Sequence, residues 1–294
     1  MALSWTLDGV EYDLENGELC YHQGNAGFGM APFHRLEERG PLQHGVTDRG
    51  YRLDARTIQL ALALFAHTRE DLYIKRNQIL AIFQPLEVAG TLKSTEGTRV
   101  RCIDCYAQGG GLAFLTSDRK GFWQKAAVIL KADDPTWYNP DGKAVTFSLS
   151  GGGSGTPVPT PVPTSVGAST INESYTIDYS GTAPSFPHLI RFTGPITDPV
   201  LINNSTGDKL DFTGTTIVDG DYYDIDLRFD KKTVVNAAGV NKEHLLSDDS
   251  SITTWNIERA PVAPGGQNSI TATGSGANAN TKIDISYYER DSGV

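Results

Sequence analysis

The sequence predicts a mainly β protein with one helix, divided into two domains by a linker rich in glycine and proline. Its length of 294 residues suits two domains of ordinary size. Its 31 glycines and 15 prolines favour short strands joined by turns. The run Gly151–Pro163 combines flexible glycines with an extended Pro-x-Pro stretch, which cannot form a packed core. We therefore expect domains at 1–150 and 168–294, with a linker at 151–167.

The first domain is predicted to be α+β. Trp5–Tyr12 indicates a hairpin, because Asp-Gly suits a type I′ turn. Arg56–Phe65 alternates apolar residues on one face, as a half-buried strand does. Arg69–Phe83 changes to helical spacing and is stopped by Pro85, which predicts the one substantial helix. Further strands are expected at 86–94, 98–107 and 122–131.

The second domain contains no helical segment of useful length. Short alternating runs such as Ile190–Phe192, Ile225–Phe229 and Ile283–Ile285 are separated by Gly, Asn, Asp and Pro. Many short strands with frequent turns are typical of a β-sandwich. A jelly roll or a barrel would give a similar pattern, so both remain open at this point.

The charge argues against a protein that grips nucleic acid. The formal net charge is -10, and residues 151–294 carry 9 basic against 17 acidic side chains. Such a chain is unlikely to hold phosphates, although it could line a passage through which DNA moves. The start of the sequence lacks a secretory signal, and the longest apolar run is too short to span a bilayer. We expect synthesis in the cytoplasm and no membrane insertion.

No catalytic, cofactor-binding or metal-binding residues are predicted, and the chain is not expected to be an enzyme. Cys102 and Cys105 form a C-x-x-C string, but no second ligand pair accompanies it. Residues three apart on a strand face opposite sides, so buried strand cysteines are the favoured interpretation. The odd total of three cysteines also favours a reduced compartment over a disulfide framework.

Two strings in the second half could suggest ligand binding. Asp219–Asp226 is dense in aspartate, but it lacks the glycine and late glutamate of a calcium loop, so a solvated strand face is favoured. Trp255, with Glu258 and Arg259, is similar to the sugar-stacking motif of galectins. The companion His-Asn-Arg motif is missing, and His188–Arg191 is its nearest approach. A core tryptophan is favoured, with Trp255 kept as a possible glycan contact.

Five segments, in order, resemble the distal tail proteins of long non-contractile-tailed phages. They are Gly27–Pro32 with Arg39–Arg56, Asp133–Pro140, Tyr223–Val234, Pro264–Ile270 and Thr281–Arg290. The resemblance implies an N-terminal ring-forming domain and a C-terminal galectin-like β-sandwich. It also implies a six-fold ring at the virion tail tip, between the tail tube and the tail-associated hub protein, with a channel for DNA. Tape-measure and receptor-binding proteins are the other expected neighbours.

The segment Gly27–Arg56 is expected to be long, polar and non-regular, with glycines supplying its turns. Exposed segments tied to a rigid sheet often carry contacts. Apolar side chains there could anchor a neighbouring subunit, or could pack on their own domain. The candidate subunit or partner contacts are Phe28, Met30, Gln43, His44, Asp48 and Arg49.

The leading hypothesis is therefore a structural adaptor that forms a ring and leaves a channel for DNA, which passes without specific binding. A host-carbohydrate-binding module, acting through the C-terminal sandwich and Trp255, is the alternative. A tail hydrolase is the third hypothesis, and no residue constellation favours it.

Overall fold

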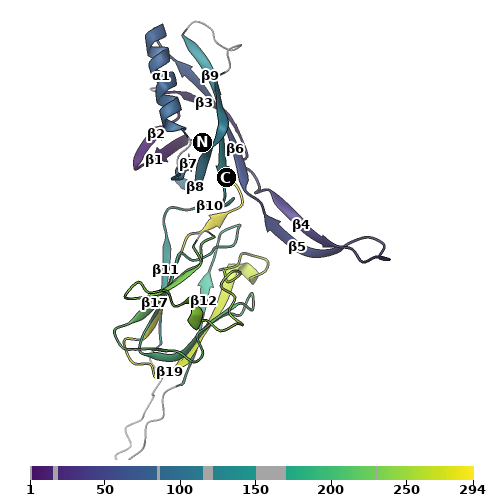
Figure 1. Ribbon diagram of the computed structural model, residues 1–294, viewed down its shortest axis with the longest axis vertical. Coiled ribbons are helices and arrows are strands. Elements are labelled where there is room, and N and C mark those ends of the chain that lie inside the picture. Colours follow the sequence, from purple (N-terminus) through teal and green to yellow (C-terminus); the bar gives the residue numbers. More distant parts are fainter. Residues whose placement is uncertain (1, 16–18, 85–86, 115–121, 150–169, 230) are drawn as a thin grey trace, which may run out of the picture. The chain divides into compact units, whose positions relative to one another are not determined.

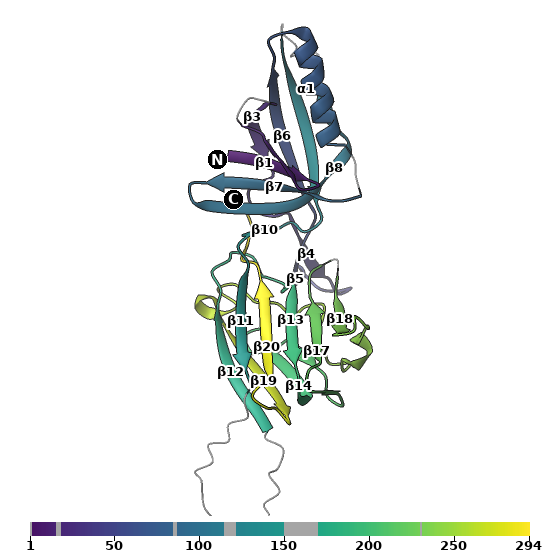
Figure 2. The same ribbon diagram turned by 90° about the vertical axis from the view of Figure 1, so that its left-hand side faces the viewer.

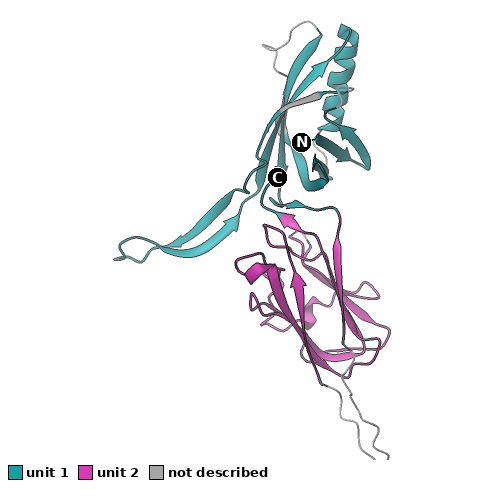
Figure 3. Ribbon diagram, turned by 180° about the vertical axis from the view of Figure 1, so that it is seen from behind, with its two compact units in different colours: residues 1–140, 291–294 teal, residues 141–290 magenta. Residues whose placement is uncertain are grey.

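The computed structural model describes residues 2–15, 19–84, 87–114, 122–149, 170–229 and 231–294. These residues form two compact units (Figure 3). Unit 1 comprises residues 1–140 and 291–294, and unit 2 comprises residues 141–290. Strands account for 51% of the chain and helical residues for 8%, which confirms the predicted mainly β class.

Unit 1 is built on a long antiparallel sheet, in which the described strands follow the order β2-β1-β7-β8-β9-β6-β3. Short β10 pairs with β8 at Tyr138 and Cys102. Figure 2 shows α1 running along this sheet. The bounds are β1 (Ala2–Leu7), β2 (Val10–Asp13), β3 (Tyr21–Ala26), β6 (Arg56–Phe65), α1 (Arg69–Ile82), β7 (Gly90–Glu96), β8 (Arg99–Phe114), β9 (Trp123–Ala132) and β10 (Trp137–Tyr138).

Local sequence signals form the first hairpin and the helix. Asp8 and Gly9 both have positive φ, 49° and 78°, as a type I′ turn requires. At the start of α1, the Thr68 side chain accepts a hydrogen bond from the Asp71 amide at 3.1 Å. This N-cap satisfies an amide that has no partner inside the helix. The type I′ turn and the helix confirm the sequence-based predictions.

The core of unit 1 lies between α1 and one face of the sheet. On β6, Ile58, Leu60, Leu62 and Leu64 are all buried, as their alternation predicts. They pair in register with alternate residues of β9, such as Leu130 opposite Ile58. The helix contributes Leu72, Ile79 and Ile82.

A two-stranded ribbon extends away from this sheet (Figure 1). It consists of β4 (Phe33–Glu38) and β5 (Thr47–Leu53), paired antiparallel, and we call residues 33–53 the arm. The sequence-based expectation of a non-regular segment is wrong for these two strands. Every residue of β4 is exposed, so neither face of the ribbon is buried and the sequence shows no alternation to reveal it.

Unit 2 is a sandwich of two antiparallel sheets, as predicted. One sheet has the order β11-β20-β13-β17-β18, and the other has β12-β19-β14-β15 with β16 beside β14. The bounds are β11 (Lys143–Ser148), β12 (Thr170–Asp178), β13 (Leu189–Thr193), β14 (Ile196–Asn203), β15 (Lys209–Asp211), β16 (Thr216–Ile217), β17 (Tyr222–Asp226), β18 (Thr233–Asn236), η2 (Glu243–Leu245), η3 (Pro264–Gly266), β19 (Gln267–Ser275) and β20 (Lys282–Tyr287). Short β21 (Arg290–Asp291) spans the boundary between the two units and belongs to neither sheet of the sandwich.

The sandwich encloses one hydrophobic core. Phe192 lies on β13 in one sheet, and Phe212 directly follows β15 of the other. Their rings meet edge-on, with centroids 5.6 Å apart. Trp255 lies in this core and is 0% exposed. Of the apolar face predicted for Ile225, Leu227 and Phe229, the first two are buried, whereas Phe229 is 52% exposed.

The boundary between the units differs from the sequence-based division at residue 150. The first strand of unit 2 is β11, which pairs with β20 along its whole length, from Lys143 opposite Tyr287 to Ser148 opposite Lys282. The expected linker at 151–167 lies outside the described residues. The strands that flank it, β11 and β12, both belong to unit 2. The pairing of β11 with β20 therefore assigns β11 to the second unit. The composition of the linker could not indicate this pairing.

Candidate functional site

The arm exposes apolar side chains that no core covers. Leu42 at its tip is 96% exposed and Met30 beside its base is 77% exposed. Further exposed apolar residues of the arm are Phe33, Leu36, Val46 and Tyr51. A group of apolar side chains raised on a thin ribbon is unusual for a surface in contact with water alone, and such groups mark interaction sites.

Ion pairs across the two strands hold the arm in register. Arg35 Nη1 lies 2.5 Å from Asp48 Oδ2, and Arg49 Nε donates to Glu38 Oε2 at 2.6 Å. All four side chains are more than half exposed, so each pair contributes little free energy by itself. Asp48 also accepts from the Gly50 amide at 2.9 Å, where φ of Gly50 is +105°. Asp48 and Arg49 thus shape the arm.

The tip of the arm is organised around Gln43. Its Oε1 accepts from the Gly40 amide at 3.0 Å, and its Nε2 donates to Thr47 Oγ1 at 2.8 Å. Gln43 therefore closes the turn between the strands. His44, next to it, is exposed. Of the sequence-predicted contact residues, Met30, Gln43, His44, Asp48 and Arg49 all lie on the arm or at its base.

Phe28 differs from the other candidates, because it is buried within its own unit. Its side chain is 7% exposed and its ring centroid lies 5.2 Å from that of Trp137. Of the two alternatives left open by the sequence, packing on its own domain is the one observed. Phe28 is therefore not carried into the set of exposed contacts.

The arm is attached at a root built around the buried side chain of Arg56. This guanidinium donates to four backbone oxygens: Pro135 O at 2.7 Å, Gly27 O at 2.6 Å, Gly29 O at 2.8 Å and Ser292 O at 2.5 Å. Arg56 is 1% exposed, so each of these charged hydrogen bonds offsets part of the cost of removing the cation from water. Burial lowers the pKa of Arg56, while the nearby carboxylate of Asp134 opposes this change.

Two of the five segments quoted for the family resemblance meet at this root, the first of them with both of its parts. Gly27–Pro32 supplies two acceptors and Phe28, Arg39–Arg56 supplies the guanidinium, and Asp133–Pro140 supplies Pro135 and Trp137. The root residues Arg56 and Trp137 were not among the predicted site residues. A charged residue at the start of an alternating apolar strand is the sequence signal that could have pointed to Arg56.

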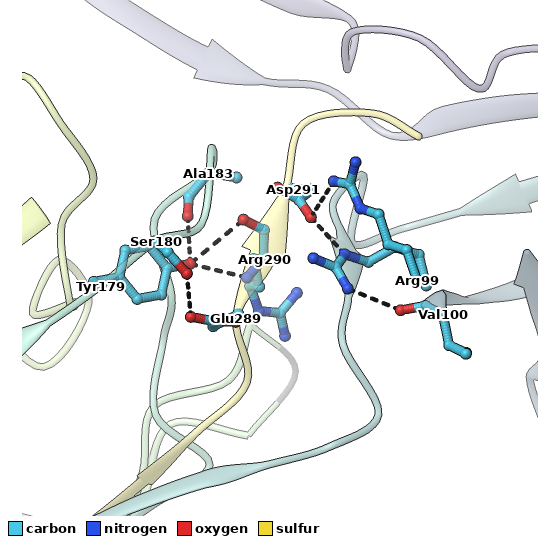
Figure 4. A network of polar contacts seen from close by, with 9 residues as sticks. Arg99, Val100, Tyr179, Ser180, Ala183, Glu289, Arg290 and Asp291 are labelled. Carbon is cyan, nitrogen blue, oxygen red and sulfur yellow. Dashed lines mark hydrogen bonds and ion pairs between the residues drawn. The ribbon is translucent and has the colours of Figure 1, made fainter. Parts of the chain in front are cut away.

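The segment Asp291–Val294 is also bound to unit 1. Asp291 is 3% exposed, and its Oδ2 accepts from Arg101 Nε at 2.5 Å and from Arg99 Nη2 at 2.9 Å. Figure 4 shows Asp291 facing Arg99. Two cations around one buried carboxylate make this a tighter contact than the exposed pairs of the arm.

In unit 2, the same view shows the hydroxyl of Tyr179 among backbone groups (Figure 4). It donates to Ala183 O at 2.6 Å and accepts from the Arg290 amide at 2.9 Å. Ser180 Oγ donates to Glu289 over a short distance, and Lys143 Nζ pairs with Glu289 at 2.6 Å. This network fixes the end of the last strand of unit 2.

The strings that suggested ligands in unit 2 have structural explanations. Trp255 is fully buried, so its ring cannot stack on a sugar in this fold. Burial raises the pKa of Glu258, whose carboxylate accepts from the Arg259 amide at 3.0 Å. In the acidic patch, Asp224 forms a bidentate pair with Arg191 at 2.6 and 2.7 Å. Asp226 pairs with Arg228.

The motif Pro264–Ile270 has a comparable structural role. Asn268 is 0% exposed, and its side chain donates to Glu258 O at 2.8 Å and accepts from the Glu258 amide at 2.7 Å. It also receives a hydrogen bond from Asn203 at 3.2 Å. These contacts satisfy the backbone beside Trp255 and connect it to β19.

All three cysteines are free, buried and located in unit 1. Burial raises the pKa of Cys20 to about 12 and that of Cys102 to about 11, and it raises the pKa of Cys105 as well. Thiols in this state are poor nucleophiles and poor metal ligands. Among the described residues, no group of three His, Cys, Asp or Glu side chains is arranged to hold a metal ion.

Within the described part of the chain, no helix has the length and apolar character needed to cross a membrane.

Comparison with known proteins points to phage tails. Residues 25–124, which include the arm, Arg56, α1 and strands β6, β7 and β8, match the family described as phage tail protein RIFT-related domain. No curated protein sequence matches the chain at a significant level.

Solved structures match over nearly the whole chain. The crystal structure of the SPP1 Dit (gp 19.1) protein, described as a paradigm of hub adsorption apparatus in Gram-positive infecting phages, aligns with a TM-score of 0.62 and 14% identity. The match covers 99% of each chain. Chains of the phage P2 baseplate in its activated conformation, with Ca and with Sr, align with TM-scores of 0.48 and 12% identity. The Ca form covers 97% of this chain and 98% of that one, and the Sr form 98% and 97%.

Identity as low as that with SPP1 Dit shows a shared fold and does not transfer a function. Residues 25–124 therefore match a phage tail protein RIFT-related domain, and the chain has, along almost all of its length, the fold of SPP1 Dit.

Proposed function

We propose that this protein is a structural adaptor of a phage tail tip, a distal tail protein that assembles as a ring of identical subunits. The exposed apolar arm carries the proposal, because Leu42 and Met30 are presented to solvent on a ribbon with no core of its own. The matching tail-protein family and the fold support the setting. Covering these side chains with a second copy would remove apolar surface from water.

In this proposal the ring is six-fold, as the family resemblance implies. It joins the tail tube to the tail-associated hub protein, with tape-measure and receptor-binding proteins as further neighbours. The role is structural and non-catalytic, and the protein assembles in the host cytoplasm before it takes its place at the virion tail tip. A net charge of -10 suits a channel through which DNA passes without being held.

The self-association is tested with Leu42→Ser in the full chain, followed by analytical ultracentrifugation over a range of concentrations. Leu42 touches no core, so the folded monomer should keep its stability while the subunit affinity falls by about tenfold or more. The matched control is Val262→Ser in unit 2, where an exposed apolar residue lies outside the arm. This control should associate as the unmodified chain does.

A protein that stays strictly monomeric at high concentration, and that binds neither tail-tube nor hub protein, would count decisively against the adaptor. Equal weakening by Leu42→Ser and Val262→Ser would instead remove the arm as the contact and leave the remainder of the proposal standing.

The alternative of a host-carbohydrate-binding module is not carried further. Its one motivating side chain, Trp255, is 0% exposed, and no other observation on unit 2 favours a glycan.

A further inference from the structure

We infer that residues Asp291–Val294 are a strap that locks the root of the arm, so that the arm acquires a fixed direction only after unit 2 has been synthesised. The lock itself is a property of unit 1. Only its consequence for assembly rests on the proposed function of the arm.

Three of the four strap residues make polar contacts with the rest of unit 1. Asp291 binds Arg99 and Arg101, as described above. Ser292 O accepts from Arg56 Nη2 at 2.5 Å, and the Val294 amide donates to Phe28 O at 3.0 Å. These contacts reach both the sheet and the loop that leads into the arm.

At Gly293 the strap lies so close to that loop that there is no space for a side chain. A Cβ atom on Gly293 would lie 2.6 Å from Gly29 O and 2.7 Å from Gly29 C, well inside van der Waals contact. The neighbours are backbone atoms, which cannot move aside as a flexible side chain would. Close approach of two backbones is a recognised reason for glycine at such a position.

The strap and the arm share Arg56. Its Nη1 holds Gly27 O and Gly29 O on the loop that leads into the arm, while its Nη2 holds the strap. The base of the arm is closed next to it, where the Asp54 amide donates to Pro32 O at 2.9 Å. If the strap leaves, a buried guanidinium loses one acceptor, and the loop that it holds is free to shift.

The order of synthesis means that the strap is made long after the arm whose root it locks. The arm and Arg56 are made early, whereas Ser292 follows Arg56 by 236 positions and comes after all of unit 2. Domains fold as units from the N-terminal side during synthesis. A growing chain therefore carries an arm whose root is unlocked, and association through the arm is delayed until the chain has passed unit 2.

The test compares hydrogen exchange in Gly293→Ala with that in the unmodified full chain. The Cβ atom displaces the strap, so we expect the amides of Val294 and Asp54 to exchange about tenfold faster or more. Amides of the β1–β2 hairpin, which these strap contacts do not touch, should keep their rates. The matched control is Gly29→Ala on the facing loop, where an added Cβ meets nothing within 4 Å.

A second variant tests the strap by another route, in case the strap relaxes around the methyl group of Gly293→Ala and stays in place. Asp291→Asn keeps the shape of the side chain and removes its charge from between Arg99 and Arg101. It should accelerate the same two amides, although less than Gly293→Ala does. The inference is overturned if Val294 exchanges faster in these variants while Asp54 is unchanged, or if all amides of unit 1 accelerate together.

Subunit affinity, measured on the same variants, separates this inference from the proposed function. Weaker association together with faster exchange at Asp54 supports both. Faster exchange at Asp54 with unchanged association supports the strap and removes the arm as the subunit contact.

Discussion

The arm of unit 1 and the sandwich of unit 2 use paired strands in opposite ways. In the sandwich, alternate residues such as Ile283 and Ile285 on β20 enter one core and are at most 1% exposed. In the arm, Phe33 and Tyr51 meet edge-on across the two strands and both remain half exposed. Backbone hydrogen bonds are thus enough to pair two strands, but a paired strand is stable on its own only when one face is buried in a hydrophobic core.

An isolated two-stranded ribbon is marginally stable in water. The arm therefore depends on what holds its root, above all the buried Arg56, and on whatever covers its apolar side chains. The sandwich instead has a hydrophobic core of its own. Substitutions in the two regions should consequently differ in size and in the property that they affect.

The largest effect is expected from Trp255→Ala. Removing a fully buried ring leaves a cavity in the sandwich and should lower the free energy of unfolding of unit 2 by about 3–5 kcal/mol. Urea denaturation measures this loss. Thiol labelling reports unit 1 separately, because Cys20, Cys102 and Cys105 all lie there and should stay protected.

The matched control for that substitution is Phe229→Ala, also in unit 2, where the ring is 52% exposed and the loss should be much smaller. A loss below about 1 kcal/mol for Trp255→Ala would contradict the assignment of this ring to the core.

A smaller but substantial effect is expected from Arg56→Lys. Lysine keeps the charge but cannot reach the four carbonyl oxygens with the geometry of a guanidinium, so unit 1 should lose about 3 kcal/mol. The measurement is thiol labelling of the three buried cysteines as urea is raised. Arg52→Lys, at an exposed site on the arm, is the control and should leave labelling unchanged. Identical labelling of both variants would mean that Arg56 does not hold the root.

An intermediate effect, dependent on pH, is expected from His188 in unit 2. Burial lowers its pKa, and Arg228 lowers it further. The unfolded chain therefore binds a proton near pH 6.5 before the folded protein does, so the stability of unit 2 should fall as pH drops below that value. His188→Phe keeps a ring against Tyr288, 4.7 Å away in the native protein, and removes the titration.

Comparison of denaturation curves at pH 7.5 and 5.5 measures this effect as a difference between the two proteins. The same pH dependence in His188→Phe and in the unmodified chain would assign it to other groups.

The smallest effect is expected on the arm itself. Asp48→Asn removes the ion pair with Arg35 but keeps an oxygen for the Gly50 amide, so unit 1 should lose less than about 1 kcal/mol. The loss should shrink further in high salt. Denaturation at two salt concentrations checks both points, and Arg35→Gln should reproduce them. A loss above about 2 kcal/mol would show that the arm is stabilised by its charges rather than by its root.

Local signals in the sequence anticipated the elements whose causes are local. The type I′ turn at Asp8 and Gly9, the alternation of β6 and the helix from Arg69 to Ile82 could all be predicted, because each depends on neighbours a few residues away. The two strands of the arm were not predicted, because both faces of the ribbon are exposed to solvent and its residues therefore show no apolar alternation. Of the candidate subunit contacts, Phe28 alone is in the core of its own unit, where it meets Trp137, a residue that lies more than a hundred positions away.

The mainly β class, the single helix and the family resemblance could be predicted from the sequence, because composition, periodicity and short motifs are local properties. Tertiary structure alone decided that β11 belongs to unit 2, that Trp255 is core and that Arg56 joins Gly27 to Ser292. Each of these depends on pairing or burial between distant segments. Such contacts are specified by how the whole chain excludes water and satisfies its buried polar groups.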